Sequence, residues 1–437
     1  MAQIFKNNTW GQLASQLTAG ATTATLSAGH GFTDPGTDWY LATLIGVTGT
    51  TETSWEIVKV TAVSTNTLTI VRAQEGTTDA TWPAGTRIEL RLTAGATESK
   101  ANLGNAAYAN LLGPNAYFAK SVPTKVAWSK TGNDTAKLNQ LLHVEVNGLI
   151  LIIAADTAIT MPSMTAGTDY AIWCKTDGSL EASSNHVTPP AANARKIGGF
   201  HYALGSNAAA QAGGGNTAQI NAYSFWDLKW RFAGADPRGM ALVAGSFWCD
   251  IYLLNTDPDT NGTSKYNVTI ADGASPPKIP TAFGGNGSTT YGTLTWFEAQ
   301  EVLAAYGKRC PTQAEYMAMA YGVTEKTARG SDPGSTGLDQ ARTSRWGIMQ
   351  ATGNLLVWGR ELTGSGDSNA AGWATFDTEN RGDFYYPADF KLTAARLGGA
   401  WFDGEDAGSR CANWNAAPLN SSGNIGARGV GDHLQLV

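Results

Sequence analysis

Charged side chains are scarce in this sequence of 437 residues. Asp, Glu, Lys and Arg together make up 15 %, and the formal net charge is −6. A nucleic-acid partner requires a basic surface that offsets phosphate charge, so we expect none here. No run approaches the ~18 apolar residues that span a bilayer, and we expect no membrane insertion. The polar start MAQIFKNNTWGQLASQ is unlike a secretory signal, which predicts synthesis in a host cytoplasm without a signal peptide.

Cysteine and histidine are few and dispersed. The cysteines are Cys174, Cys249, Cys310 and Cys411, and the histidines are His30, His143, His186, His201 and His433. No CxxC or zinc-site spacing occurs, so we expect no metal site and no cofactor. The cysteines are expected to be mostly free, buried thiols, with room for one chance pair.

Glycine and tryptophan, in contrast, are abundant. The chain contains 51 Gly and 15 Trp. Bulky aromatic side chains and frequent Gly turns are typical of β-rich domains, and they argue against a disordered or coiled-coil chain. The length is sufficient for two or three domains that each bury a core. The predicted fold class is therefore mainly β.

The sequence divides into four predicted segments. Residues 1–95 alternate polar and apolar side chains, as in WEIVKVTAVSTNTLTIVRAQ, and are predicted to form an amino-terminal β domain. Residues 96–115 are predicted to be a linker, in part helical, that ends at a Gly-Pro pair. Residues 116–222 are predicted to form a β-sandwich domain, and residues 223–437 an α+β domain.

Local signals refine this division. Asn147-Gly148 predicts a tight hairpin turn between two strands. Two capping boxes, at 295–298 and 312–315, predict the starts of two helices, which Gly307 and Gly322 are expected to end. The low-complexity stretch 205–221 is interpreted either as a flexible linker or as a segment that packs closely against a neighbouring copy.

Motifs in the last third of the chain carry a family resemblance. GKRCPTQAEYMAMAYG (307–322), TGNLLVWGREL (352–362), RLGGAWFDG (396–404) and GARGVGDHL (426–434) occur in this order. They resemble the C-type-lectin-like fold shared with the formylglycine-generating enzyme superfamily. The similarity is closer to the major tropism determinant family of bacteriophages, and it runs from about residue 116 to the end. Residues 1–95 depart from that family and resemble attachment modules of tail-fibre proteins.

The resemblance implies an architecture and a function. It implies an intertwined homotrimer at the distal end of the tail fibre of a virion, which binds a host cell-surface receptor, protein or glycan. It also implies that a diversity-generating retroelement replaces adenines in chosen codons of the exposed end. Residues 1–95 would then mount the trimer on other tail-fibre or baseplate proteins. Carried over by position, the variable receptor-binding residues are Phe402, Gly404, Asp406, Asn413, Asn415, Ala416, Asn420, Ser422, Asn424 and Ile425.

The spacing of these residues gives a physical reading of the same segment. Most of them alternate, and alternate side chains of an extended segment share one face. Trp401 and Trp414 would then point inward and support the face, while Phe402 and Ile425 supply apolar anchors. Asn codons hold two adenines, so adenine replacement reaches many residue types. A plainer interpretation is that Asn merely favours turns.

Fixed residues around these positions complete the predicted scaffold. Arg410, Arg428 and Asp432 are candidates for charge-assisted hydrogen bonds beneath the face, with structural roles. Gly398 and Gly399 would permit close backbone contacts.

Three rival functions remain open at this stage. An enzyme like the fold's oxidising relatives would need paired cysteines, and no catalytic residues are predicted because no such pair or Ser/His/Asp set is evident. A calcium-dependent lectin would need an oxygen-rich cage that the sequence does not display. A structural tail-fibre component, or a carbohydrate-binding lectin without diversification, is the alternative to a variable receptor-binding protein.

Overall fold

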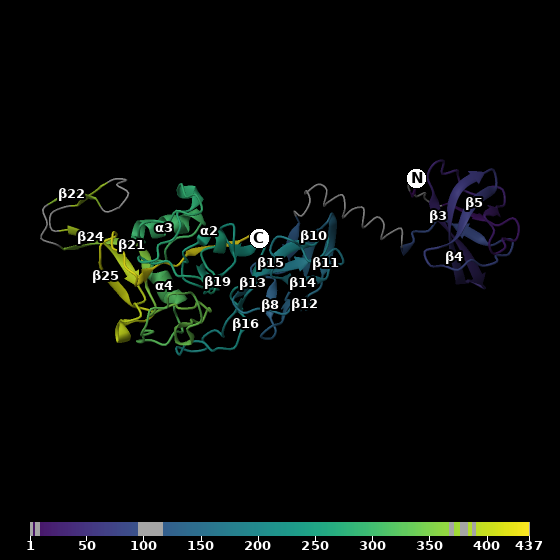
Figure 1. Ribbon diagram of the computed structural model, residues 1–437. Coiled ribbons are helices and arrows are strands. Elements are labelled where there is room, and N and C mark those ends of the chain that lie inside the picture. The colour runs from purple at the N-terminus through teal and green to yellow at the C-terminus, as the bar shows by residue number, and fades with distance from the viewer. Residues whose placement is uncertain are drawn as a thin grey trace. The chain divides into compact units, whose positions relative to one another are not determined.

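A computed structural model of the chain describes residues 3–4, 9–94, 117–366, 371–375, 383–386 and 390–436 (Figure 1). The chain forms two compact units, residues 1–107 and 108–437. The predicted linker at 96–115 lies outside the described residues. The fold is mainly β with few helices, as predicted. No helix in the described ranges is long and apolar enough to cross a membrane.

The amino-terminal unit is a small antiparallel β structure. Its strands are β1 (Trp10–Gln12), β2 (Thr23–Thr25), β3 (Tyr40–Thr48), β4 (Thr51–Ser64), β5 (Thr67–Gln74) and β6 (Arg87–Glu89). They pair in the order β1-β6-β3-β4-β5-β2. A bridge between Leu13 and Leu26 brings the two outer strands together, so the sheet closes on itself around an apolar core.

A buried carboxylate organises this core. The Glu56 side chain is fully buried and accepts hydrogen bonds from Arg72 Nε and Trp82 Nε1, both at 2.7 Å. Burial opposes ionisation, but the bonds from Arg72 and Trp82 outweigh it and lower the pKa of Glu56. The charge is therefore held inside the unit by its hydrogen-bond partners.

The second unit begins with a β-rich half. Its strands are β7 (Phe118–Lys120), β8 (Trp128–Lys130), β9 (Ala136–Leu138), β10 (Leu142–Val146), β11 (Leu149–Ile153), β12 (Ile159–Thr160), β13 (Thr168–Cys174), β14 (Leu180–Ser183), β15 (Arg195–Ala203) and β16 (Gln219–Ile220). The predicted hairpin turn is confirmed, because Asn147 (φ +51°) and Gly148 (φ +83°) join β10 to β11. One continuous apolar core lies between these strands.

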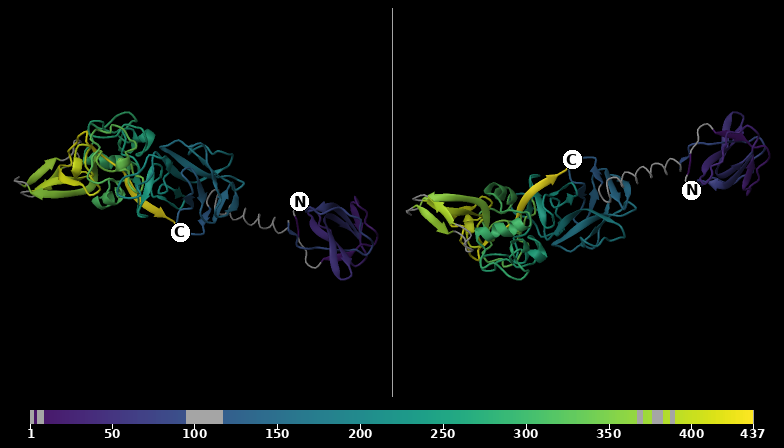
Figure 2. Two further views of the ribbon diagram at one scale, coloured as in Figure 1. Left: turned by 90° about the horizontal axis from the view of Figure 1, so that it is seen from below. Right: turned by 90° about the horizontal axis from the view of Figure 1, so that it is seen from above.

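A long sheet joins this half to the remainder of the unit. It adds β17 (Trp226–Asp227), β18 (Trp230–Phe232), β19 (Met240–Val243), β20 (Phe247–Asp250) and β27 (Val430–Gln435). The strand order is β12-β14-β13-β15-β17-β18-β27-β20-β19, with β16 beside β15. The last strand of the chain therefore pairs with both β18 and β20, and the carboxyl end returns to the middle of this unit (Figure 2).

Both predicted capping boxes are present. Among the described residues, the helices are α2 (Pro258–Asn261), α3 (Trp296–Ala305) and α4 (Gln313–Met319), with 3₁₀ turns η1 (Thr281–Phe283), η2 (Gln340–Arg342) and η3 (Gly404–Asp406). Thr295 and Glu298 cap α3, and Thr312 and Glu315 cap α4. Gly307 and Gly322 follow the helices with positive φ.

The low-complexity stretch 205–221 packs against its own chain. Gly213 donates a backbone hydrogen bond to Gly322 at 2.9 Å. A Cβ at Gly213 would lie 2.4 Å from the Gln340 carbonyl oxygen, so the approach requires glycine. At this position the small residue serves a close contact within the chain.

The candidate site is built on a separate small sheet. Its strands are β21 (Leu356–Gly366), β24 (Phe390–Leu397), β25 (Ala412–Ala416) and β26 (Ile425–Gly426), in the order β25-β24-β21-β26; β22 (Gly372–Thr375) pairs with β23 (Asp383–Tyr386) alone. The predicted variable positions lie in residues 402–425. The end of this segment is held in the sheet because β26 pairs in parallel with β21.

Candidate functional site

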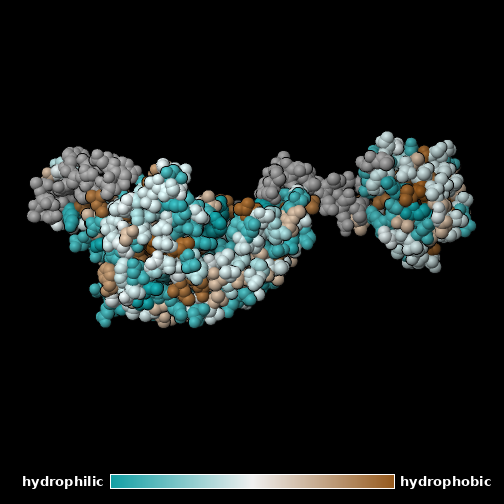
Figure 3. Space-filling model, in the orientation of Figure 1, coloured by the Kyte–Doolittle hydropathy of each residue, from teal (hydrophilic) through white to brown (hydrophobic). Residues whose placement is uncertain are grey.

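Seven of the ten predicted variable positions are exposed. They are Phe402, Gly404, Asp406, Asn413, Asn415, Asn420 and Ser422. Asn424 is half-buried. Hydrophobic patches elsewhere on the visible face of the molecule are small, and most of that face is hydrophilic or neutral (Figure 3). The seven exposed positions are accessible to solvent in this chain.

The strand β25 shows the predicted alternation. Asn413 and Asn415 are exposed, while Trp414 between them is half-buried and packs against the core. Asn413 Oδ1 accepts hydrogen bonds from Arg396 Nη2 and from the Asn415 backbone N–H, both at 3.0 Å. The Asn413 side chain is thus held in place at the surface, which lowers the entropy lost when it makes a further contact.

Phe402 and residues 404–406 are exposed for a different reason from the one predicted, and Asp403 between them is half-buried. They were expected to be extended, but Gly404–Asp406 form the 3₁₀ turn η3. Asp403 accepts a hydrogen bond from the Ala400 backbone N–H at 2.7 Å, and Gly404 has φ +56°. In a turn closed by this carboxylate, consecutive residues are exposed to solvent. The two-residue spacing therefore does not determine which side chains are exposed there.

Two predicted positions are buried, which corrects their outward placement. Ala416 is 0 % exposed and Ile425 is 1 % exposed, and both belong to the apolar core beneath β25. Ala416 follows Trp414 by two residues on the same strand, so the alternation that exposes Asn415 turns Ala416 inward. Ile425 pairs with Leu356 in the sheet. Phe402, at 61 % exposed, is left as the apolar anchor among the ten.

The two predicted supporting tryptophans lie beneath the face. Trp401 and Trp414 are half-buried and pack on one core cluster. The Trp401 ring meets the Phe402 ring edge-on at a centroid distance of 5.4 Å. The Trp401 carbonyl accepts a hydrogen bond from the Gly330 backbone N–H at 2.8 Å. Phe402 is therefore presented on a fixed aromatic base.

The three predicted charged scaffold residues have different environments. Arg428 is fully buried and donates to the carbonyls of residues 250, 251, 349 and 350 at 2.7–3.1 Å. Asp432, within β27, is 79 % exposed at its side chain and pairs with Arg309 at 2.8 Å. Arg410 is exposed and makes no side-chain hydrogen bond to any described residue. The prediction of a bond beneath the face is wrong for Arg410, because its side chain points to solvent.

Glycines hold the turn behind the face as predicted. Gly398 and Gly399 have φ of +90° and +85°. A Cβ on Gly398 would lie 2.0 Å from Tyr316 Oη, and one on Gly399 would lie 2.7 Å from the Ala407 Cβ. Neither position has room for a side chain, so the path from β24 into the exposed turn depends on them.

The loop 420–424 is held by residues that the sequence reading missed. The Ser421 hydroxyl accepts a hydrogen bond from the Leu294 backbone N–H at 3.0 Å. The Ser422 carbonyl accepts one from Gly273 at 3.1 Å. A Cβ on Gly273 would lie 2.3 Å from the Ser422 nitrogen. These supports lie about 130–150 residues upstream, and a single sequence holds no local signal for them.

The cysteines near these motifs are not activated. Burial raises the pKa of Cys310 far above its ordinary value, and burial together with Asp403 raises the pKa of Cys411. All four cysteines are free thiols, which agrees with the expectation of mostly free cysteines, and no chance pair forms. Raised pKa values keep the thiols protonated and therefore poorly nucleophilic. Within the described ranges, no cluster of His, Cys, Asp or Glu could hold a metal ion.

Known proteins resemble both the sequence and the fold. A family model described as the Mtd second domain matches residues 126–227. The tail fiber receptor-binding protein of Bordetella phage BPP-1 is 50 % identical over 332 residues, which are 73 % of this chain and 85 % of that protein. The solved U1 variant of the major tropism determinant has a TM-score of 0.70 at 49 % identity, over 75 % of this chain and 88 % of that one. The solved P3c variant of the major tropism determinant has the same TM-score at 43 % identity, over 87 % of this chain and 93 % of that one.

Proposed function

Because the chain belongs to the major tropism determinant family, we propose that it is a tail-fibre protein of a bacteriophage and binds a receptor on the host surface. The printed names of its relatives describe receptor binding and tropism. The observation that supports a binding face on this chain is the exposure of Asn413, Asn415 and Asn420, with Trp414 half-buried between the first two. The proposed architecture of this half is C-type-lectin-like.

The proposed binding face comprises the eight predicted positions that reach the surface: Phe402, Gly404, Asp406, Asn413, Asn415, Asn420, Ser422 and Asn424. Amide and hydroxyl groups of this kind can form adaptable hydrogen bonds, as antibody loops do. Ala416 and Ile425 have no place in it. A face with one large aromatic residue is expected to bind weakly, since hot spots favour Trp, Tyr and Arg.

Assembly as a homotrimer would compensate for weak single contacts. Several linked faces on one particle raise the effective strength of binding by roughly 10²–10⁴-fold. Light scattering of the purified chain tests this step, with a trimeric mass expected. A monomeric mass would contradict the proposed assembly.

We attribute the mounting of the trimer on other tail-fibre or baseplate proteins to the amino-terminal unit. Its outer surface carries Trp10 and Trp55 at 52 % and 50 % exposed. Arg87 lies over the Trp10 ring at 5.5 Å, and Trp55 Nε1 donates to Glu52 at 3.2 Å. Exposed, pre-positioned Trp and Arg side chains are typical anchors of protein interfaces. Replacing Trp10 and Trp55 with alanine should yield particles that lack this protein.

Diversification by a retroelement belongs to the same proposal. It predicts, in the neighbouring DNA, a near-copy of the last coding stretch with adenines at the variable codons, together with a reverse-transcriptase gene. Sequencing of the flanking DNA decides this point. A region without either would support a receptor-binding protein with a constant face.

A competition experiment tests receptor binding itself. Purified full-length protein, incubated with host cells, should block adsorption of the phage in proportion to its concentration. Protein that fails to compete at saturating concentration would favour a purely structural fibre component. Competition that is lost on adding a chelator would favour a calcium-dependent lectin instead. The proposal includes no enzymatic activity.

A further inference from the structure

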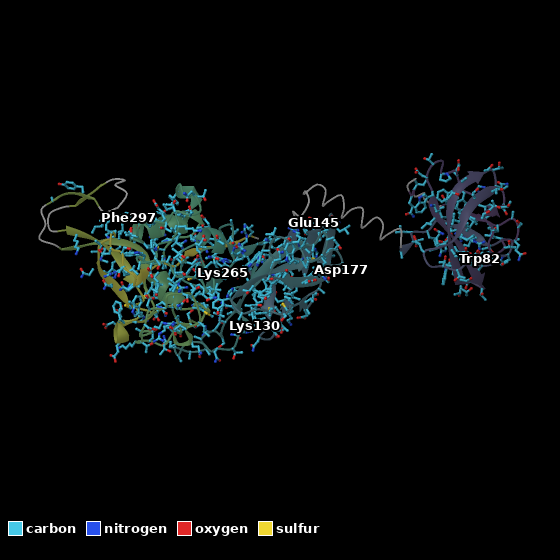
Figure 4. All side chains as sticks on the ribbon, in the orientation of Figure 1. Trp82, Lys130, Glu145, Asp177, Lys265 and Phe297 are labelled. Atoms are coloured by element: carbon cyan, nitrogen blue, oxygen red, sulfur yellow. The ribbon has the colours of Figure 1, made fainter. Side chains whose placement is uncertain are left out.

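A cavity lies in a part of the second unit that contributes none of the eight positions of the proposed binding face, which is called the asparagine face below. The loop 233–239, between β18 and β19, borders a hollow of about 380 Å³. Its walls come from β15, β17, β18, this loop and residues 186–187, between β14 and β15. A smaller adjoining hollow of about 100 Å³ is lined by Lys265, which is labelled in Figure 4. A volume of this size suits one small molecule and not a polymer laid along the surface.

The larger cavity has a surplus of positive charge. Lys196 and Arg231 line it, and neither forms a salt bridge with a residue in the described ranges. Lys196 Nζ donates to the His186 carbonyl at 2.8 Å, and Arg231 Nη1 donates to the Gly234 carbonyl at 3.0 Å. These carbonyls position the two cations without neutralising them.

A third cation at the cavity is already paired. Arg238 forms an ion pair with Asp236 at 2.5 Å. Three cations and one carboxylate leave two positive charges here, in a chain whose net charge is −6. Burial, followed by the charge of Arg238, lowers the pKa of Lys196, and the charge of Asp236 opposes this shift in part. An anionic ligand would relieve this repulsion.

Most of the remaining lining, apart from His186, is apolar. Trp226 is 6 % exposed, and Leu228 beside it is half-buried. Leu228 and the small exposed part of Trp226 can contact C–H groups of a sugar ring, while the Asp236 carboxylate can accept hydrogen bonds from hydroxyl groups in addition to those from Arg238. An inorganic anion would contact only the cationic side chains of the cavity. The cavity therefore offers separate partners for a charge, for hydroxyl groups and for an apolar ring face.

We propose that this cavity binds an acidic monosaccharide unit, with Lys196 and Arg231 holding its carboxylate or phosphate group and Trp226 and Leu228 contacting its ring. Such a unit could be free in solution or terminal on a surface glycan, and the recognition chemistry is the same. The site is independent of the proposed asparagine face. It would add a constant contact to a protein whose other contacts are proposed to vary.

Calorimetric titration of the full-length protein tests the proposal with matched probes. Glucuronate should bind saturably, and glucose, which lacks the carboxylate, should bind at least about tenfold more weakly. Methyl β-glucuronide, which mimics a chain-linked unit, should bind like glucuronate if the natural ligand is a glycan end. Its failure to bind would restrict the site to the free sugar. Added salt should weaken binding of either acidic probe.

Variants assign the binding to these residues. Lys196→Gln with Arg231→Gln should weaken glucuronate at least about tenfold, whereas Lys196→Arg with Arg231→Lys should retain most of the affinity. Lys175→Gln, at a half-buried lysine outside the cavity lining that is paired with Glu181, is the matched control and should change nothing. Thermal unfolding of each variant separates lost binding from lost folding.

Three results would overturn the proposal. Glucose binding as tightly as glucuronate would show that the charge does not contribute to binding. An unchanged affinity of the Lys196→Gln/Arg231→Gln variant for glucuronate would show that the ligand does not bind in this cavity. Inorganic phosphate binding as tightly as glucuronate would show an anion site with no sugar recognition. Adsorption of phage through the asparagine face is measured separately, so failure here leaves the proposed function standing.

Discussion

Replacing Ile425 with alanine distinguishes the core from the surface within the predicted variable segment. The side chain is 1 % exposed and packs in the core beneath β25. The change removes three buried carbon atoms, worth about 2.4 kcal/mol at about 0.8 kcal/mol each. The cavity that remains adds to this cost, so we expect a loss of about 3–4 kcal/mol, within the usual range for such changes.

Thermal unfolding followed by tryptophan fluorescence measures this loss. For a unit of this size the melting temperature should fall by roughly 2 °C per kcal/mol, hence by about 6–8 °C. Asn415→Ala is the matched control, because Asn415 is exposed in the same small sheet and its replacement should cost less than about 0.5 kcal/mol. Equal melting temperatures for the two variants would refute the assignment of Ile425 to the core.

Further predictions concern buried groups in both units. Arg428→Met leaves four carbonyls without their donor and should cost about 3 kcal/mol or more, seen as a lower denaturant midpoint; an unchanged midpoint would contradict this. Gly398→Ala places a Cβ 2.0 Å from Tyr316 Oη at φ +90° and should cost at least about 2 kcal/mol by the same measure, whereas a soluble variant of native stability would show that the turn can relax. Glu56→Gln should destabilise the amino-terminal unit near neutral pH. The folded pKa of Glu56 is lowered by Arg72, so its contribution is complete above the ordinary pKa of 4.5 and is lost as pH falls below it. The difference between Glu56→Gln and the unaltered chain should therefore shrink towards pH 3, and a constant difference would be against the assignment.

Local rules in the sequence predicted local structure well. The Asn147-Gly148 hairpin and the two capping boxes are each specified by a few adjacent residues, and all three are present. The pairing of β27 with β18 and β20 joins segments about 180–200 residues apart, and no local pattern specifies such a pairing. Sequence reasoning therefore found elements but not the sheet that connects them.

The candidate site shows the same limit at the level of single residues. Alternation correctly exposes Asn413 and Asn415, because that stretch is a strand. It fails at 404–406, where a 3₁₀ turn replaces the strand, and carry-over by position alone placed Ala416 and Ile425 outside. Burial depends on which strand lies beneath a residue, and the Leu356–Ile425 pairing is a tertiary property.

The rate of phage adsorption to host cells tests the central proposal most directly. Particles would carry Asn413→Ala, Asn415→Ala and Asn420→Ala together, three exposed changes that should leave folding and particle assembly intact. We expect adsorption to fall at least about tenfold, because three polar contacts are removed from every face and the loss is multiplied by avidity. Intact particles that adsorb at the unaltered rate would contradict the claim that this face binds the receptor.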